Sequence, residues 1–119
     1  MHRDHPRARR VGEQIQRILA QLIRDKIKDP RLGMVTVSAV RVSRDLGQAK
    51  VFVTVLGDEQ QREDSLHVLH KAAGFLRSEL GREMTLRAVP QLCITYDESI
   101  EYGTRLSSLI DSAIADDAN

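Results

Sequence analysis

The most informative stretch of the sequence is HKAAGFLRSELGREMTLRAVP at residues 70–90. These residues read as a helix that breaks at Ala72-Ala73-Gly74 and begins again, because glycine costs about 1 kcal/mol in a helix interior relative to alanine. Flexible backbone within an apolar helical pattern marks a kink or a close approach by another molecule. A new helix start has free N–H groups, and Lys71 and Arg77 flank this one, which suits a phosphate. The alternative is a glycine that only caps one of two short core helices.

Upstream of this stretch, an amphipathic helix is predicted from Arg9 to Lys28. Aliphatic side chains recur there at three- and four-residue steps and form one apolar stripe. Asp29-Pro30 ends the helix, since the residue before a proline disfavours the helical conformation. In the turn that follows, we expect Leu32 to be a buried anchor. Arg31 is expected to be exposed, either available to a phosphate or paired with Asp29 or Asp25.

Two β-strands come next, over Met34–Ser43 and Ala49–Leu56, with the turn Arg44–Gly47 between them. Both strands are rich in β-branched residues that alternate with other side chains. In the first strand the alternation slips by one residue, which exchanges the two faces of a strand. We therefore expect a β-bulge near Ala39-Val40.

Around the break, one helix is predicted from Gln61 to Ala72 and a second as far as Gly81. A third strand is predicted over Leu86–Tyr96. Asp97 or Ser99 can then cap a last helix, whose apolar face is Leu106, Leu109, Ile110, Ala113 and Ile114.

The order α-β-β-α-kink-α-β, with a C-terminal helix, predicts an α+β domain. Its three-stranded sheet carries helices on one face. The other face would stay partly open, and the side chains that could populate it are Thr36, Lys50, Phe52 and Thr54.

Length and composition suit one domain. The chain has 119 residues, of which 41% are hydrophobic and 3% aromatic, so the core must be aliphatic. Its single cysteine, Cys93, excludes an internal disulfide and a multi-cysteine zinc site. No apolar run reaches transmembrane length, which indicates a cytoplasmic protein. We expect a flexible N-terminus at 1–8, a single domain at 9–115, a short acidic tail at 116–119, and a monomer.

The formal net charge of +1 conceals an asymmetry. Residues 1–56 carry twelve Lys and Arg against five Asp and Glu, whereas residues 57–119 carry six against twelve. The balances are +7 and −6, which points to one basic and one acidic surface. The basic part could meet nucleic acid or an acidic protein, or the two faces could simply be solvated.

Catalytic patterns are few. Glu63, His67 and His70 follow one another at helical spacing and could hold a metal, although such residues on an exposed helix face are more often solvated. Cys93 has no neighbouring histidine, and buried strand cysteines are usually inert. No phosphate-binding loop, dinucleotide fingerprint or nucleophile elbow is present. The sequence therefore indicates a binding module that is not an enzyme and needs no cofactor.

The order of elements resembles that of a type II KH domain, an RNA-binding fold. A usual KH module clamps the nucleic-acid backbone with a GXXG loop. This chain has Ala72-Ala73-Gly74 there, which is similar to the variant of the ribosome-binding factor A family. Further segments resemble that family in its order and spacing, over roughly Arg7–Leu109: RxxRV at 7–11, KDPRLG at 28–33, SRDL at 43–46, AKVFVTVL at 49–56, AAGFLRSELG at 72–81 and LRAVPQL at 86–92.

This resemblance implies a small-subunit assembly factor. Members of the family bind the free or immature 30S ribosomal subunit and assist late maturation of 16S rRNA, including its 5′ end, without catalysis. Scarce aromatic residues favour recognition of the rRNA backbone over base stacking. The alternative is an adaptor whose basic helix docks an acidic protein partner.

The expected rRNA contacts lie at both ends of the first helix and around the break. They are Arg7, Arg9, Arg10, Lys28, Arg31, Lys71, Ala72, Gly74, Arg77, Arg82 and Arg87. Second choices, on the predicted hairpin, are Arg41, Arg44 and Lys50.

Overall fold

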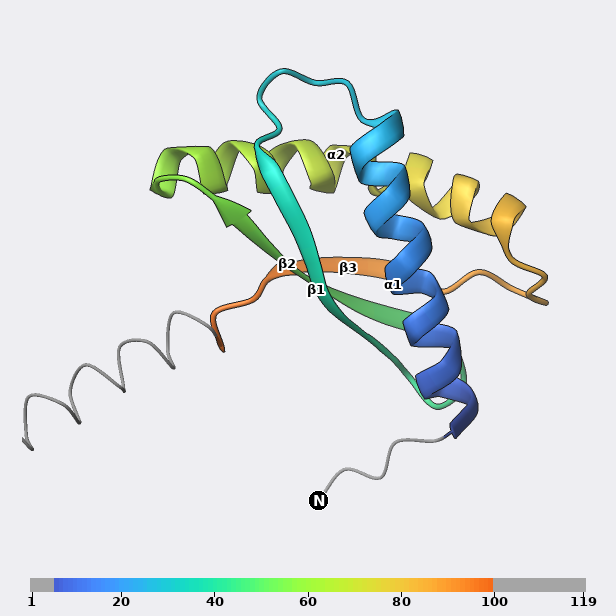
Figure 1. Ribbon diagram of the computed structural model, residues 1–119. Coiled ribbons are helices and arrows are strands. Elements are labelled where there is room, and N and C mark those ends of the chain that lie inside the picture. The colour runs from blue at the N-terminus through green and yellow to red at the C-terminus, as the bar shows by residue number, and fades with distance from the viewer. Residues whose placement is uncertain (1–5, 100–119) are drawn as a thin grey trace, which may run out of the picture.

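The computed structural model describes residues 6–99 of the chain. They form two helices and three strands in one α+β domain (Figure 1). The elements in chain order are α1 (Pro6–Lys26), β1 (Met34–Val42), β2 (Gln48–Leu56), α2 (Glu59–Glu83) and β3 (Gln91–Tyr96). The C-terminal helix predicted after Asp97 lies outside the described residues.

The sheet has the order β1-β2-β3. β1 runs antiparallel to β2 through a tight turn, whereas β3 runs parallel to β2. A parallel pair needs a crossover connection, and α2 with the loop after it supplies one. The open face that the sequence predicts is present, because Ala49, Val51, Val53 and Val55 of β2 are buried while the residues between them are less so.

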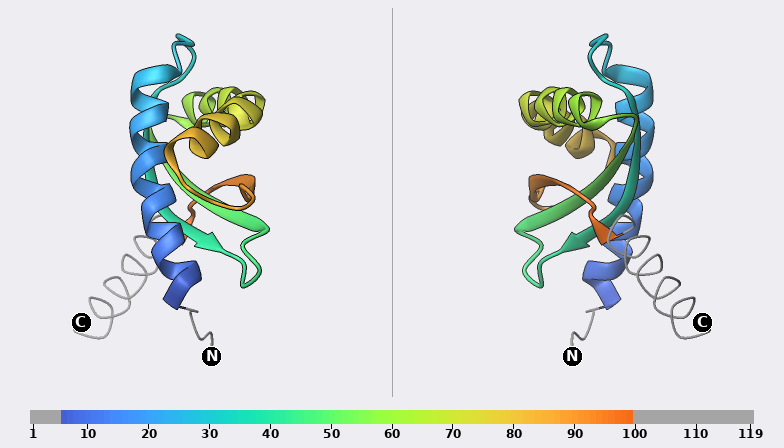
Figure 2. Two further views of the ribbon diagram at one scale, coloured as in Figure 1. Left: turned by 90° about the vertical axis from the view of Figure 1, so that its right-hand side faces the viewer. Right: turned by 90° about the vertical axis from the view of Figure 1, so that its left-hand side faces the viewer.

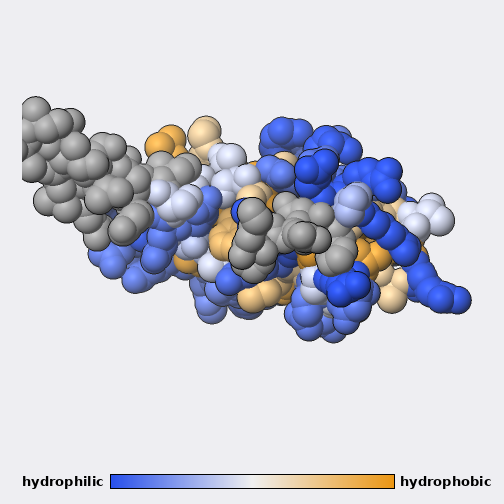
Figure 3. All heavy atoms as spheres, turned by 90° about the horizontal axis from the view of Figure 1, so that it is seen from below, coloured by the Kyte–Doolittle hydropathy of each residue, from blue (hydrophilic) through white to orange (hydrophobic). Residues whose placement is uncertain are grey.

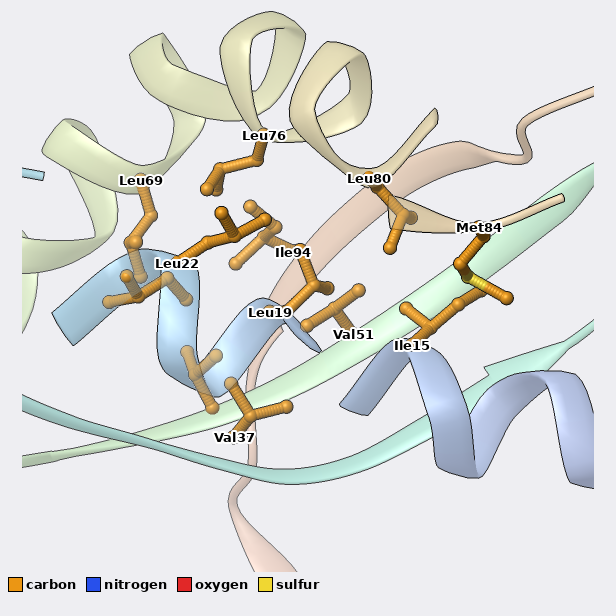
Figure 4. Packing of buried hydrophobic residues seen from close by; sticks show 12 residues of the cluster. Ile15, Leu19, Leu22, Val37, Val51, Leu69, Leu76, Leu80, Met84 and Ile94 are labelled. Atoms are coloured by element: carbon orange, nitrogen blue, oxygen red, sulfur yellow. The ribbon is translucent and has the colours of Figure 1, made fainter. Parts of the chain in front are cut away.

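The helices and the sheet enclose a single aliphatic core. Ile15, Leu19 and Leu22 of α1 meet Leu76 and Leu80 of α2 above the buried valines of the sheet (Figure 4). Each fully buried leucine or isoleucine contributes about 1.5–3 kcal/mol relative to an exposed one. The apolar stripes of both helices are therefore fixed toward the sheet, and their polar sides are left for binding.

Helix α1 begins earlier than the sequence predicts, at Pro6 instead of Arg9, and ends at Lys26 instead of Lys28. Proline is favoured in the first turn of a helix, because the N–H that it lacks would have no partner there. Near this end α1 lies close against β1. A Cβ atom on Gly12 would lie 2.8 Å from the Val40 carbonyl oxygen, so only glycine fits.

The predicted β-bulge is confirmed, one residue away from its expected place. Val37 pairs with Val53 and Ala39 with Phe52, so Ser38 is the additional residue. The bulge is held from both sides of the sheet. Gln16 of α1 donates its side-chain N–H to the Val37 and Ser38 carbonyls at 3.0 and 3.2 Å. The Ser38 hydroxyl donates to Asp97 Oδ2 at 2.6 Å.

The break predicted at Ala72–Gly74 is wrong as an interruption, since α2 is continuous from Glu59 to Glu83. What remains is a bend, because the two halves of α2 do not share one axis (Figure 2). The cost of one glycine, about 1 kcal/mol, is smaller than the gain from burying Leu69, Leu76 and Leu80 on one helix face.

The beginning of α2 also differs from the prediction of Gln61. Asp58 accepts the Gln61 N–H at 2.8 Å, and the Gln61 side chain accepts the Asp58 N–H at 2.8 Å. This capping box satisfies two N–H groups that the first helical turn would leave without partners.

The third strand is shorter than predicted and begins at Gln91 instead of Leu86. Residues 84–90 form a loop, here named loop 84–90, which ends at the buried Pro90. Proline cannot donate to a β-ladder, so pairing with β2 starts directly after it. No helix among residues 6–99 is long and apolar enough to cross a membrane.

Candidate nucleic-acid interface

The structure divides the predicted RNA contacts among three regions. At the start of α1 are Arg7, Arg9 and Arg10. Beside the middle of α2 is a set that we name the loop–helix surface: Lys28, Arg31, Lys71, Ala72 and Gly74. At the end of α2 and in loop 84–90 are Arg77, Arg82 and Arg87. The second choices Arg41, Arg44 and Lys50 are exposed on the hairpin, as expected.

The loop–helix surface exists because loop 27–33 lies against α2. The Gly33 N–H donates to Ser65 Oγ at 2.9 Å, and Ser65 is fully buried. Leu32, the expected anchor, is partly buried and packs against the core. Lys71 is close enough for its charge to help lower the pKa of Asp29. Segments far apart in the sequence therefore bring their cations to one side of the molecule.

Arg31 both pairs with Asp29 and stays exposed. Its Nη2 lies 3.0 Å from Asp29 Oδ2, and its backbone N–H donates to Oδ1 at 2.9 Å. These hydrogen bonds hold the pKa of Asp29 below its usual value and raise the pKa of Arg31. The Arg31 side chain is still 53% exposed, so a phosphate can reach guanidinium N–H groups that the carboxylate leaves open.

Lys28 and Lys71 are the two cations of this surface without a carboxylate partner among the described residues. Both are exposed, and no carboxylate in residues 6–99 lies within ion-pair distance of either. An ammonium group without a carboxylate partner gives up only water when it meets a phosphate. These two lysines are therefore the strongest candidates for phosphate contacts.

Gly74 lies on the exposed side of α2, and a Cβ atom placed there would meet nothing within 4 Å. Because the backbone is helical on both sides, its neighbouring N–H groups point along the helix and are not a phosphate seat of the kind predicted.

Arg77 has a structural role. Its Nε donates to the Pro90 carbonyl at 3.1 Å and its Nη2 to the Val89 carbonyl at 2.8 Å. The guanidinium fork thus ties loop 84–90 to α2. Among the predicted contacts, Arg77 is the one whose hydrogen bonds reach a distant part of the fold, so its removal is expected to affect stability.

Arg82 and Arg87 extend the basic surface toward the end of α2. The Arg82 side chain is 76% exposed and lies 3.8 Å from Glu79, and Arg87 is exposed in loop 84–90. The opposite end of α2 has the other sign. A hollow of about 540 Å³ there is lined by Asp58, Glu59, Gln60 and Glu63. A polyanion would be repelled from that end of the helix and attracted to its middle and last turns.

The arginines at the start of α1 form a separate patch. Arg10 and Lys26 are sixteen residues apart on one helix, or about 24 Å along its axis. The first turn of α1 contains no acidic residue, and its free N–H groups add positive charge. Hydrophilic side chains occupy much of the described surface at this end of the molecule (Figure 3).

The metal site that the sequence allowed at Glu63, His67 and His70 is not formed in residues 6–99. No three His, Cys, Asp or Glu side chains in this part of the chain are placed to hold a metal ion. His70 of the predicted trio is engaged elsewhere, with its Nε2 2.9 Å from the Ile94 carbonyl oxygen. Cys93 is exposed, contrary to the expectation of a buried strand cysteine, because β3 turns it to the open face of the sheet.

Comparison with known proteins agrees with this geometry. The sequence model of ribosome-binding factor A matches residues 7–110. The chain belongs to the ribosome-binding factor A family. A family member from Thioalkalivibrio sulfidiphilus is 61% identical over 117 residues, covering 98% of this chain and 91% of its own length.

Solved structures of the family share the fold. The crystal structure of ribosome-binding factor A from Thermus thermophilus has a TM-score of 0.69 at 32% identity, covering 77% of this chain and 97% of its own. The coordinates of a homology model of the Thermus thermophilus factor, fitted into a cryo-EM map of a 30S complex, have a TM-score of 0.66, also at 32% identity. They cover 76% of this chain and 96% of their own. The family's variant of the KH fold is therefore the fold of this chain.

One surface residue escaped the sequence prediction. Phe75 directly precedes the fully buried Leu76, but it is itself 45% exposed. A signal was available, because Phe75 follows the exposed Lys71 by four residues and precedes the exposed Ser78 by three. Helical spacing alone therefore places Phe75 on the same exposed side of α2 as Lys71 and Ser78.

Proposed function

We propose that this protein binds the free, immature 30S ribosomal subunit and assists late maturation of 16S rRNA, including its 5′ end. The observation that carries the proposal is family membership over almost the whole chain. A structural relative at 32% identity was fitted into a map of a 30S complex, which supports the same partner for this chain.

The charge distribution supports a role through binding alone. Exposed lysines and arginines without catalytic neighbours attract phosphates, and the released counterions make such binding strong at low salt and reversible at high salt. An assembly factor must both occupy an rRNA surface and leave it. We propose that the loop–helix surface faces the rRNA backbone and that no chemical step or cofactor is involved.

Sedimentation with separated ribosomal particles tests the proposal. The protein is expected to travel with free 30S subunits and to stay behind when complete ribosomes are loaded instead. Equal binding to both particles would contradict the proposed preference for the free subunit, and binding to neither would refute the proposal.

Maturation is tested in cells depleted of the protein. Precursor 16S rRNA with an unprocessed 5′ end is expected to accumulate. Expression of the unaltered chain in these cells is expected to restore normal 5′ ends. Expression of the double variant Lys28→Ala with Lys71→Ala should not restore normal 5′ ends. The control Arg17→Ala with Arg24→Ala removes the same charge outside the three regions and should restore them. Normal 5′ ends after depletion would contradict the maturation role.

The alternative of a protein adaptor predicts a different partner. Binding to protein-free 16S rRNA and binding to the ribosomal proteins of the small subunit can be measured separately. Binding of the chain to protein-free 16S rRNA supports the proposal. Binding to the ribosomal proteins but not to the rRNA supports the adaptor.

A further inference from the structure

Among residues 6–99, the ring of Phe75 is the one aromatic ring without a cation placed over it. Residues 6–99 contain three aromatic side chains. Lys50 lies 5.4 Å from the ring centre of Phe52, and Arg62 lies 4.4 Å from that of Tyr96. Within the same part of the chain no cation is placed over the ring of Phe75, and this side chain is 45% exposed. Its π-face is therefore available to a partner from outside.

The neighbours of Phe75 on α2 are positively charged or polar. Lys71 lies one turn before it, Ser78 one turn after it and Arg82 two turns after it, and all three are exposed. Glu79 also lies one turn after Phe75, but its side chain is only 21% exposed and lies 3.8 Å from Arg82. An exposed ring beside the unpaired Lys71, with its neighbouring carboxylate close to an arginine, suits a nucleotide better than an apolar protein segment, because a nucleotide combines a flat π-system with a phosphate.

The helix surface just before Phe75 is also open. Apart from the two chain neighbours of Gly74 and the backbone of the helix itself, nothing lies within 4 Å of the position that a Cβ atom would occupy there.

We propose that Phe75 stacks against one unpaired base of the bound RNA while Lys71 contacts a phosphate beside it. This rests on the proposed function, since the RNA is the rRNA of the small subunit. The surface would then combine backbone contacts, which carry no sequence information, with one contact that requires an unpaired base. Such a contact would let the protein distinguish an immature rRNA region from one in which that base has become paired.

A series of variants separates stacking from simple apolar contact. Phe75→Tyr keeps the aromatic ring, Phe75→Leu keeps apolar bulk without it, and Phe75→Ala removes both. Equilibrium binding of each full chain to free 30S subunits is measured over a range of salt concentrations. Circular dichroism verifies that each variant is folded, and Ser78→Ala serves as a control one turn away.

Stacking predicts that Phe75→Tyr binds within about twofold of the unaltered chain. Phe75→Leu and Phe75→Ala should bind about five- to a hundredfold more weakly, the loss expected for one stacked base. The dependence of log K on log salt should keep its slope, because no phosphate contact is lost, whereas Lys71→Ala should lower that slope by about one.

Equal affinity of Phe75→Leu and the unaltered chain would overturn the stacking proposal and leave the proposed function intact. Equal losses for the tyrosine and leucine variants would overturn it as well. If the unaltered chain does not bind 30S subunits, the proposed function itself fails, and this inference fails with it.

Discussion

Two glycines in helices show how the surroundings of one residue decide its role. Gly12 of α1 lies against β1, where a Cβ atom would be 2.8 Å from the Val40 carbonyl oxygen. Gly74 of α2 has empty space at the same position. In the sequence both are single glycines within helical patterns, and the difference arises only from tertiary contacts.

Alanine at these positions should therefore change stability in opposite directions. Gly74→Ala should raise the free energy of unfolding by up to about 1 kcal/mol, since alanine is the better helix former and meets no obstacle. Gly12→Ala should lower it by about 1–3 kcal/mol, because α1 must move away from β1. Urea denaturation of the two variants measures both effects. A loss of stability in Gly74→Ala would indicate that α2 is interrupted at this glycine after all.

Arg77 should behave as a structural residue. Arg77→Ala leaves the Val89 and Pro90 carbonyls without their partner and should cost about 1–3 kcal/mol of stability. Arg77→Lys should recover only part of this loss, because an ammonium group cannot reproduce the guanidinium fork. Thermal unfolding beside Arg87→Ala, an exposed arginine in loop 84–90, provides the comparison. An unchanged Tm in Arg77→Ala would mean that the loop is held by its own packing.

At the level of helices and strands, the sequence predicted those elements whose pattern is local. The apolar stripe of α1 and the alternation of β1 and β2 follow directly from the order of the residues, and so does the bulge. The continuous α2 could not be read in this way, because it depends on burying leucines against a helix and strands far away in the chain. The late start of β3 follows from Pro90, and the hydrogen bonds from Arg77 that tie the end of loop 84–90 to α2 could not be foreseen from the sequence.

The bulge of β1 links the sheet to the segment after β3. Asp97 accepts hydrogen bonds from the Ser38 hydroxyl at 2.6 Å and from the Ser99 hydroxyl and backbone N–H at 2.6 and 3.0 Å. These bonds, that from Ser38 above all, hold the pKa of Asp97 below its ordinary value of 3.8. A carboxylate with a lowered pKa in the folded state stabilises the fold above its unfolded pKa, and this contribution disappears as the pH falls through the folded pKa.

Asp97→Asn should therefore be less stable than the unaltered chain at neutral pH. The difference should persist down to about pH 4 and shrink below it, as the carboxylate of the unaltered chain takes up a proton. Urea denaturation between pH 2.5 and 7, in steps of roughly half a unit across that aspartate range, measures the difference. A stability difference that stays constant over this whole range would show that the Asp97 charge does not hold the bulge.

Over the whole molecule, the sequence predicted which residues are cationic but not which of them lie together. Lys28 and Lys71 are distant in the chain and meet on one side because Gly33 is bonded to Ser65. Arg10 and Lys28 belong to one predicted helix, yet its length keeps them apart. Arg77 resembles its neighbours in charge, and only its hydrogen bonds reveal its structural role. Charge can be counted in a sequence, whereas its arrangement requires the fold.

If this chain binds free 30S subunits through the cations of the loop–helix surface, its affinity for these subunits must depend on salt through Lys28 and Lys71. This dependence is measured as the affinity for free 30S subunits over a range of salt concentrations. The measurement compares the unaltered chain, Lys28→Ala with Lys71→Ala, and the matched control Arg17→Ala with Arg24→Ala. The lysine variant should bind more weakly, most clearly at low salt, and its slope of log K against log salt should fall by about two, one for each phosphate contact. The control should keep a slope close to that of the unaltered chain. A folded lysine variant with unchanged affinity and slope would show that the loop–helix surface does not contact the rRNA.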